Sequence, residues 1–252
     1  MTGEFPIPDA LRSLGTPLHV YPPRAGAGRA GYFTAGTVLA LLAGLTVIGI
    51  VNPPDNPPPE IVLISVMGVC GMLALICFGM GLFAQTYTLF LFPDALARAG
   101  ADQPEIFRWS DVREFYSYVN PMVARHRIVA QDGRKLEIDS SVKDAKKLGQ
   151  TVQQTLVDRM MPAATAAFEK GETLTFGPLR LDQSFLYYKK KRLSWNEVAK
   201  MQLAYNPHTR SIHFEVRALG SALLPWCVVK TQDIPNVIVF TKLAERKRAF
   251  TK

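Results

Sequence analysis

The sequence has few cysteines and lacks the motifs of the common enzyme classes. Three cysteines among 252 residues exclude a small secreted domain held together by disulfides. The chain contains no Cys-x2-Cys pair, no Gly-x4-Gly-Lys-Ser/Thr loop and no Gly-x-Ser-x-Gly turn. Of the four histidines, His208 and His213 lack the cysteine pair that would complete a zinc site, and His126 and His213 fit surface or hydrogen-bonded positions better than metal ligands. We therefore expect no catalytic residue, no metal site and no cofactor, with an enzyme of unrecognised type as a remote alternative.

Charge is absent from two long stretches. Residues 32–51 and 61–83 comprise 20 and 23 residues without one Asp, Glu, Lys, Arg or His. Helices of these lengths measure roughly 30 Å or more, enough to cross the hydrocarbon core of a bilayer. The segment between them, residues 52–60, is rich in proline and too short to fold by itself. The sequence thus excludes a wholly soluble protein and predicts a transmembrane helical hairpin at residues 32–83.

The distribution of positive charge predicts the topology. The proline-rich turn has two acidic residues and no basic one, whereas residues 85–252 have 26 Lys and Arg against 17 Asp and Glu, a net charge of +9. Because Lys and Arg next to membrane spans stay on the cytoplasmic side, both termini are predicted to be cytoplasmic. No small-x-small pattern follows the first span, which favours an uncleaved anchor over a signal peptide.

Small side chains recur along both spans, and we take them as helix-packing candidates. They are Gly36, Ala40 and Gly44 in the first span, and Cys70, Ala74, Cys77 and Gly81 in the second. Small residues allow helix backbones to approach closely, either between the two spans or in a homo-oligomer. No charge interrupts either span, which argues against a pump, proton relay or transporter.

The remainder of the chain contains an internal repeat. Trp109-Ser-Asp-Val matches Trp195-Asn-Glu-Val, and an Asn-Pro pair follows each tryptophan after eleven residues, at Asn120 and Asn206. Strand-like stretches surround each tryptophan, and a helical pattern closes each copy, the first with Pro162 as a kink or restart. We therefore predict an α+β fold: a cytoplasmic segment at residues 1–31, the hairpin, and two modules at residues 84–171 and 172–252. Each module is an antiparallel sheet or barrel with a C-terminal helix, as in pleckstrin-homology (PH)-like domains, and each repeated tryptophan faces its core.

Several short motifs of this chain are similar to those of one bacterial family. They are Leu14-Gly15-x-Pro17, Arg108-Trp-Ser-Asp-Val112, Gly177-Pro-Leu-x-Leu181, Leu193-Ser-Trp195, Leu224-Pro-Trp226 and Asp233-Ile-Pro-Asn236. With its two spans, the chain resembles a family of bacterial two-pass membrane proteins with tandem PH-like cytoplasmic domains. The resemblance covers most of the chain, and its most specific part is Ile-Pro-Asn before the last helix. It implies the fold and a place in the bacterial inner membrane, but it transfers no activity.

The strongest interaction candidate is the basic run Lys189-Lys190-Lys191-Arg192, expected to form a turn between two strands. Near the cytoplasmic leaflet, each basic residue is attracted to anionic lipid headgroups by about 1 kcal/mol. The alternative is a solvated hairpin tip that protects a sheet edge. A nucleic-acid partner is disfavoured because the remaining positive charge is diffuse. We predict a non-enzymatic, membrane-anchored binding or scaffold protein for a protein partner or anionic lipid, with a structural homo-oligomer as the alternative.

Overall fold

The computed structural model describes residues 6–24, 29–51, 60–83, 87–100, 103–119, 124–208, 210–221 and 224–250. The chain divides into two compact units. The first consists of residues 1–91, 97–105 and 141–143, and the second of residues 92–96, 106–140 and 144–252. The fold combines helices with antiparallel sheets, and two apolar helices precede most of the strands, as predicted.

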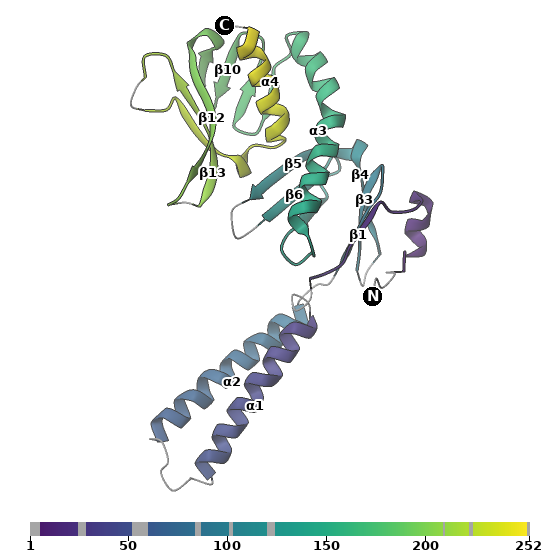
Figure 1. Cartoon of the computed structure of the whole chain (residues 1–252), viewed down its shortest axis with the longest axis vertical. Helices are drawn as coiled ribbons and strands as arrows, with labels where there is room; N and C mark the ends of the chain where they lie inside the picture. Colours follow the sequence, from purple (N-terminus) through teal and green to yellow (C-terminus); the bar gives the residue numbers. More distant parts are fainter. Residues whose placement is uncertain are drawn as a thin grey trace. The chain divides into compact units, whose positions relative to one another are not determined.

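The two apolar helices, α1 (Arg29–Val51) and α2 (Glu60–Phe83), run side by side (Figure 1). Within them, Gly31–Ile48 and Val62–Gly81 are long and apolar enough to cross a membrane by length and composition. The predicted spans therefore agree with the helices to within three residues. Residues 52–59 of the predicted turn lie outside the described residues.

The segment that precedes α1 is folded. It contains the 3-10 helix η1 (Asp9–Leu14) and the strand β1 (His19–Tyr21), and the side chain of Leu11 is fully buried. Strand β1 pairs antiparallel with β2 (Thr88–Leu91), with Tyr21 opposite Leu89. The two apolar helices are therefore inserted between two neighbouring strands of one sheet. This corrects the predicted division into a separate segment 1–31 and a module that begins at residue 84.

The same order of elements occurs twice: a four-stranded sheet, a 3-10 helix, a three-stranded sheet and a helix. After β1 and β2, the first half continues with β3 (Ala95–Ala99), β4 (Glu105–Arg108), η2 (Trp109–Asp111), β5 (Val112–Val119), β6 (Ala124–Ala130), β7 (Lys135–Ile138) and α3 (Ala145–Glu169). The second half has β8 (Leu174–Phe176), β9 (Leu179–Leu181), β10 (Phe185–Tyr188), β11 (Lys191–Ser194), η3 (Trp195–Glu197), β12 (Val198–Asn206), β13 (Ser211–Ala218), β14 (Cys227–Lys230), η4 (Thr231–Asp233) and α4 (Val237–Phe250). In each half the strands of a sheet follow one another in chain order.

The repeat extends to individual hydrogen bonds. Trp109 and Trp195 begin the two 3-10 helices, and each is 3% exposed, which confirms that both face the interior. The indole N–H of Trp109 donates to the Pro93 carbonyl at 3.0 Å, and that of Trp195 donates to the Asp182 carbonyl at 2.8 Å. The strand after each tryptophan has a register shift at the same place, next to Val112 and next to Val198. Of the two Asn-Pro pairs, Asn206 ends β12, and Asn120 lies outside the described residues.

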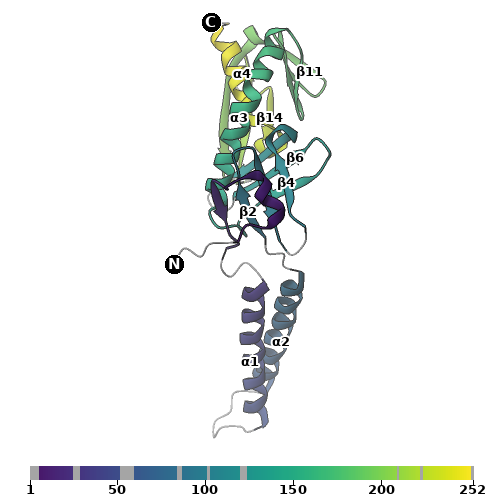
Figure 2. The same ribbon diagram turned by 90° about the vertical axis from the view of Figure 1, so that its right-hand side faces the viewer.

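Helix α3 is continuous through Pro162 and contributes to both halves (Figure 2). Buried residues near its start, such as Leu148, lie over β5 and β6. Farther along, Val157 and Phe168 belong to the hydrophobic core of the second half. The helix does not restart at Pro162, and the predicted boundary at residue 171 does not separate two independent cores.

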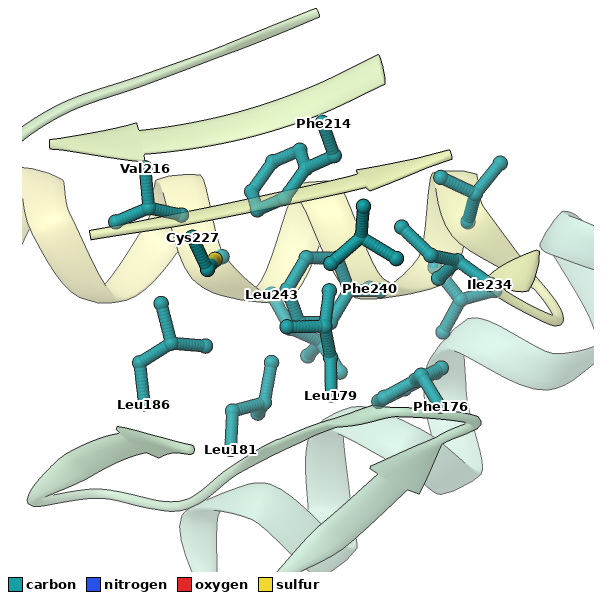
Figure 3. Packing of buried hydrophobic residues seen from close by; sticks show 14 of the residues in the cluster. Phe176, Leu179, Leu181, Leu186, Phe214, Val216, Cys227, Ile234, Phe240 and Leu243 are labelled. Carbon is teal, nitrogen blue, oxygen red and sulfur yellow. The ribbon is translucent and has the colours of Figure 1, made fainter. Parts of the chain in front are cut away.

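The core of the second half lies between its two sheets and α4 (Figure 3). Leu179, Leu181 and Leu186 from the four-stranded sheet face Phe214, Val216 and Cys227 from the three-stranded sheet. The ring of Phe240 on α4 packs edge-on against Phe214, with 5.1 Å between centroids. Burial raises the pKa of the Cys227 thiol to about 12, so this cysteine stays protonated and acts as a packing residue.

Asn236 joins the two halves. Its backbone N–H donates to the Phe115 carbonyl at 2.8 Å, and its side-chain oxygen accepts from the Phe115 N–H at 3.0 Å. Its side-chain nitrogen donates to the Arg113 carbonyl, also at 3.0 Å. Strand β5 is the edge of its sheet, so Asn236 occupies backbone groups that have no strand partner on that side. A Cβ on Gly177 would lie 2.6 Å from the Asp233 carbonyl oxygen, so the Gly177-Pro turn packs closely against the segment that positions Asn236.

Candidate functional site

The basic run forms the turn and the start of the second strand in the β10–β11 hairpin. Lys189 and Lys190 make a two-residue turn, because Tyr188 pairs with Lys191. Lys189 has a φ of +54°, as the first residue of such a tight turn requires. Lys191 and Arg192 begin β11, and all four basic side chains are exposed. The predicted turn between two strands is therefore confirmed.

The pairing of β9 with β10 places a fifth basic residue, Arg180, beside the four of the basic run. Tyr187 on β10 lies opposite Arg192 on β11 and opposite Arg180 on β9. The Arg180 guanidinium carbon lies 5.2 Å from the centre of the Tyr187 ring, and that of Arg192 lies 5.0 Å from the centre of the Phe185 ring. These cation–π contacts hold the charges above aromatic faces. The cationic surface is defined here as Arg180, Phe185, Tyr187, Lys189, Lys190, Lys191 and Arg192.

Asp182 provides the negative charge beside this surface. Its carboxylate accepts hydrogen bonds from the backbone N–H groups of Ser184 and Phe185 and from the Tyr187 hydroxyl, each at 2.8 Å. Partial burial opposes ionisation, but these hydrogen bonds keep the pKa of Asp182 below its ordinary value. The hydrogen bond to Asp182 in turn raises the pKa of Tyr187. The carboxylate is thus engaged by the turn between β9 and β10 and by Tyr187, and the five cations give the surface a net positive charge.

The small residues of α2 face α1. Ala74 is 4% exposed, and Cys70 and Cys77 are half-buried. A Cβ on Gly81 would lie 3.2 Å from the Cβ of Tyr32. The 4-3-4 spacing of these positions averages close to one helical turn per step, so they stay on one face. The structure therefore places the small side chains of the second span between the two helices.

Of the three small candidate residues in α1, Gly36 is the one that lies against α2. Its Cβ position lies 3.3 Å from the Phe78 ring, whereas Ala40 and Gly44 are exposed. A step of four residues exceeds one turn of 3.6, so a repeat of four drifts by about 40° per step around the helix. Gly36 therefore fits packing between the two spans, whereas Ala40 and Gly44 do not pack within the hairpin, and their role in a homo-oligomer stays a prediction.

Residues 9–251 match the model of a family of unknown function, DUF6585. The chain belongs to this family. The match runs from η1 to the end of α4 and so covers the N-terminal strand, the two apolar helices and both halves of the repeat in this chain. No curated protein matches the chain. Family membership therefore brings no activity to the cationic surface.

One histidine departs from the expectation that it is exposed or fully hydrogen-bonded. His126 on β6 is 1% exposed, and its Nε2 atom has no hydrogen-bond partner among the described residues. Its Nδ1 atom lies 3.1 Å from the Ser117 hydroxyl, and its ring stacks on Phe115. Burial lowers the pKa of His126 to about 4, so the imidazole is neutral at pH 7. In the part of the chain that the structure describes, no group of three His, Cys, Asp or Glu side chains could hold a metal ion.

Proposed function

We propose that this family member is a membrane-anchored binding protein whose cationic surface takes anionic lipid headgroups. In this proposal α1 and α2 insert as a transmembrane hairpin in a bacterial inner membrane. The two halves are PH-like modules on the cytoplasmic side. The twofold order of four strands, three strands and a helix supports the PH-like assignment, and the charge-free helices support the anchor.

The pairing of β1 with β2 supports the topology. β1 precedes the helical hairpin and β2 follows it, yet their backbones are hydrogen-bonded along three residue pairs. If both helices cross a membrane, the segments before and after them must therefore lie on the same side. The net charge of +9 on residues 85–252 favours the cytoplasmic side for both.

The main support for lipid binding is that five basic residues lie together on the β10–β11 hairpin and the neighbouring strand β9. Three of them lie over aromatic rings, and the Asp182 carboxylate is already hydrogen-bonded to Phe185 and Tyr187 of β10. Near an anionic leaflet each cation contributes about 1 kcal/mol. The membrane anchor raises the effective concentration of the cationic surface at the lipid, so even weak headgroup contacts become occupied.

The lipid test needs a protein without the membrane hairpin, and the repeat shows how to make one. Between β8 and β9, the counterparts of β1 and β2, the chain turns through Gly177 and Pro178 alone. Replacing residues 25–86 by a short Gly-Ser linker should therefore keep β1 paired with β2. A fragment that begins at residue 85 would lack β1 and expose the edge of β2. Circular dichroism and cooperative unfolding would establish that the hairpin-replaced protein folds.

The test is co-sedimentation of this protein with neutral and partly anionic liposomes at low and high salt. Changing Lys189, Lys190, Lys191 and Arg192 to Ser should weaken binding to anionic liposomes roughly 100- to 1000-fold. The matched control changes four other exposed lysines, Lys135, Lys143, Lys146 and Lys147, to Ser and so removes the same charge.

A large loss in the first variant and a small loss in the control would support a lipid surface. Equal losses would mean that net charge alone drives binding, which contradicts the proposal. Absence of binding to anionic liposomes at low salt would also contradict it, and the cationic surface would then be a candidate for a protein partner.

A further inference from the structure

A second feature lies on the outer face of the sheet β5-β6-β7. It is a hollow of about 440 Å³, lined by Tyr116, Tyr118, Arg125, Arg127, Gln232 and Asp233. This volume is within the range of pockets that take small molecules. None of its lining residues belongs to the cationic surface, so the hollow is a separate candidate site.

The hollow is preformed by strand register and by the junction between the halves. Tyr116 lies opposite Arg127 and Tyr118 lies opposite Arg125, so these four side chains stand on one face of the β5–β6 pair. The remaining wall is η4, which packs against β5. Asn236, three residues after Asp233, fixes this segment by its three hydrogen bonds to β5.

Some of the lining side chains already form ion pairs or hydrogen bonds within the protein. Arg127 forms an ion pair with Glu137 at 3.0 Å, and the Tyr116 hydroxyl donates to Glu114 at 2.9 Å. Burial and this hydrogen bond raise the pKa of Tyr116 to about 12, so it stays neutral. Arg125 has no ion-pair partner among the described residues. Its guanidinium is exposed, and Asp233 is the one acidic residue among the lining residues of the hollow.

We propose that this hollow binds a small organic phosphate, with the phosphate group on Arg125 and Arg127. Guanidinium groups bind phosphate oxygens through paired N–H donors. The two arginines are two residues apart on one strand, roughly 7 Å along it, so one phosphate can accept from both. The rings of Tyr116 and Tyr118 offer flat apolar surface to a base or sugar. Gln232 and Asp233 offer an amide and a carboxylate to its hydroxyl or amino groups.

The test is calorimetric titration of the full-length protein in neutral detergent. The soluble probes are adenosine monophosphate, ribose 5-phosphate, inorganic phosphate and adenosine, and dihexanoyl phosphatidic acid represents a lipid phosphomonoester. Arg125→Gln should weaken binding of the phosphate esters about tenfold or more. Adenosine, which has no phosphate group, should bind neither the wild-type protein nor this variant. Arg180→Gln is the matched control, because it removes an arginine of the cationic surface and leaves the hollow intact.

The outcomes separate the sources of the phosphate and the two sites. Binding of adenosine monophosphate or ribose 5-phosphate that depends on Arg125 supports a soluble ester. Binding of phosphatidic acid alone, with the same dependence, supports a lipid source of the same group. Absence of binding for every phosphate probe at millimolar concentration overturns the proposal. Binding that Arg180→Gln abolishes and Arg125→Gln leaves unchanged overturns it as well, because the phosphate would then lie on the cationic surface.

Discussion

The two halves of the chain differ at the point where the three-stranded sheet meets its helix. His126 on β6 and Phe214 on β13 hold the same position, because each lies opposite the residue eight places after the repeated tryptophan. Phe214 packs against the ring of Phe240 on α4. His126 instead lies against the backbone of Gly149 on α3, where a Cβ would lie 2.0 Å from its Nε2 atom.

One backbone arrangement thus supports two kinds of core. The second half fills the position with apolar rings, which gain free energy by leaving water. The first half places an imidazole there, opposite a glycine without a side chain. A buried polar atom with no hydrogen-bond partner costs about 1–3 kcal/mol. His126 should therefore stabilise the first half less than Phe214 stabilises the second half. The halves should therefore respond differently to mutation of the helix and to acid.

The largest effect is expected from Gly149→Ala. In an exposed helix this change is stabilising by up to about 1 kcal/mol, because alanine favours the helix. Here the new methyl group would collide with the His126 ring, and the free energy of unfolding should fall by about 3 kcal/mol. Urea denaturation of the full-length protein in detergent, followed by tryptophan fluorescence, measures the change.

The matched control is Gln150→Ala, an exposed neighbour on the same helix. A double variant identifies the cause: with His126→Ala, the ring is gone and Gly149→Ala should no longer destabilise. If the two changes were additive, contact between residues 126 and 149 would not be the reason.

An effect of similar size is expected in the dependence of stability on pH. His126 has a pKa of about 4 in the folded protein, below its ordinary value of 6.5. The unfolded chain therefore binds a proton more readily, and the free energy of unfolding falls as the pH drops below about 6.5. The loss should be complete below about pH 4 and should amount to about 3 kcal/mol.

His126→Leu removes this titration, so its unfolding free energy should change less than that of the wild type over the same pH range. Carboxylates titrate equally in both proteins, and the difference between the two curves isolates His126. Parallel curves would show that the buried histidine is not the acid-sensitive group. Phe214, its counterpart in the second half, has no such dependence.

The tryptophan repeat could be read from the sequence because its spacing is fixed by local chain geometry. Trp109 and Trp195 each begin a 3-10 helix before a strand with a register shift, and this local arrangement repeats. The strand β1 could not be found in the same way. It has only three residues, and prolines on both sides hide any alternating pattern.

The same distinction between local and long-range structure applies to the candidate sites. The turn Lys189–Lys190 is local, so the sequence predicted it. Arg180 becomes part of the cationic surface through the pairing of β9 with β10. Arg125 and Gln232 line the same hollow only because the two halves pack together. Such contacts depend on register and on long-range packing, which composition and spacing do not encode.

The smallest effect is expected at the junction between the halves. Asn236 and Asp144 each precede a helix and have a positive φ, +51° and +57° respectively, and the Asn236 side chain is hydrogen-bonded to β5 of the other half. Asn236→Gly keeps this backbone conformation accessible and removes two side-chain hydrogen bonds, so the free energy of unfolding should fall by about 2 kcal/mol. Asp144→Gly is the matched control, because its side chain makes no cap hydrogen bond, and it should change stability little. Urea denaturation measures both variants, and hydrogen exchange of the Phe115 amide should accelerate only in Asn236→Gly. Equal losses in the two variants would mean that the backbone conformation, and not the carboxamide, holds the halves together.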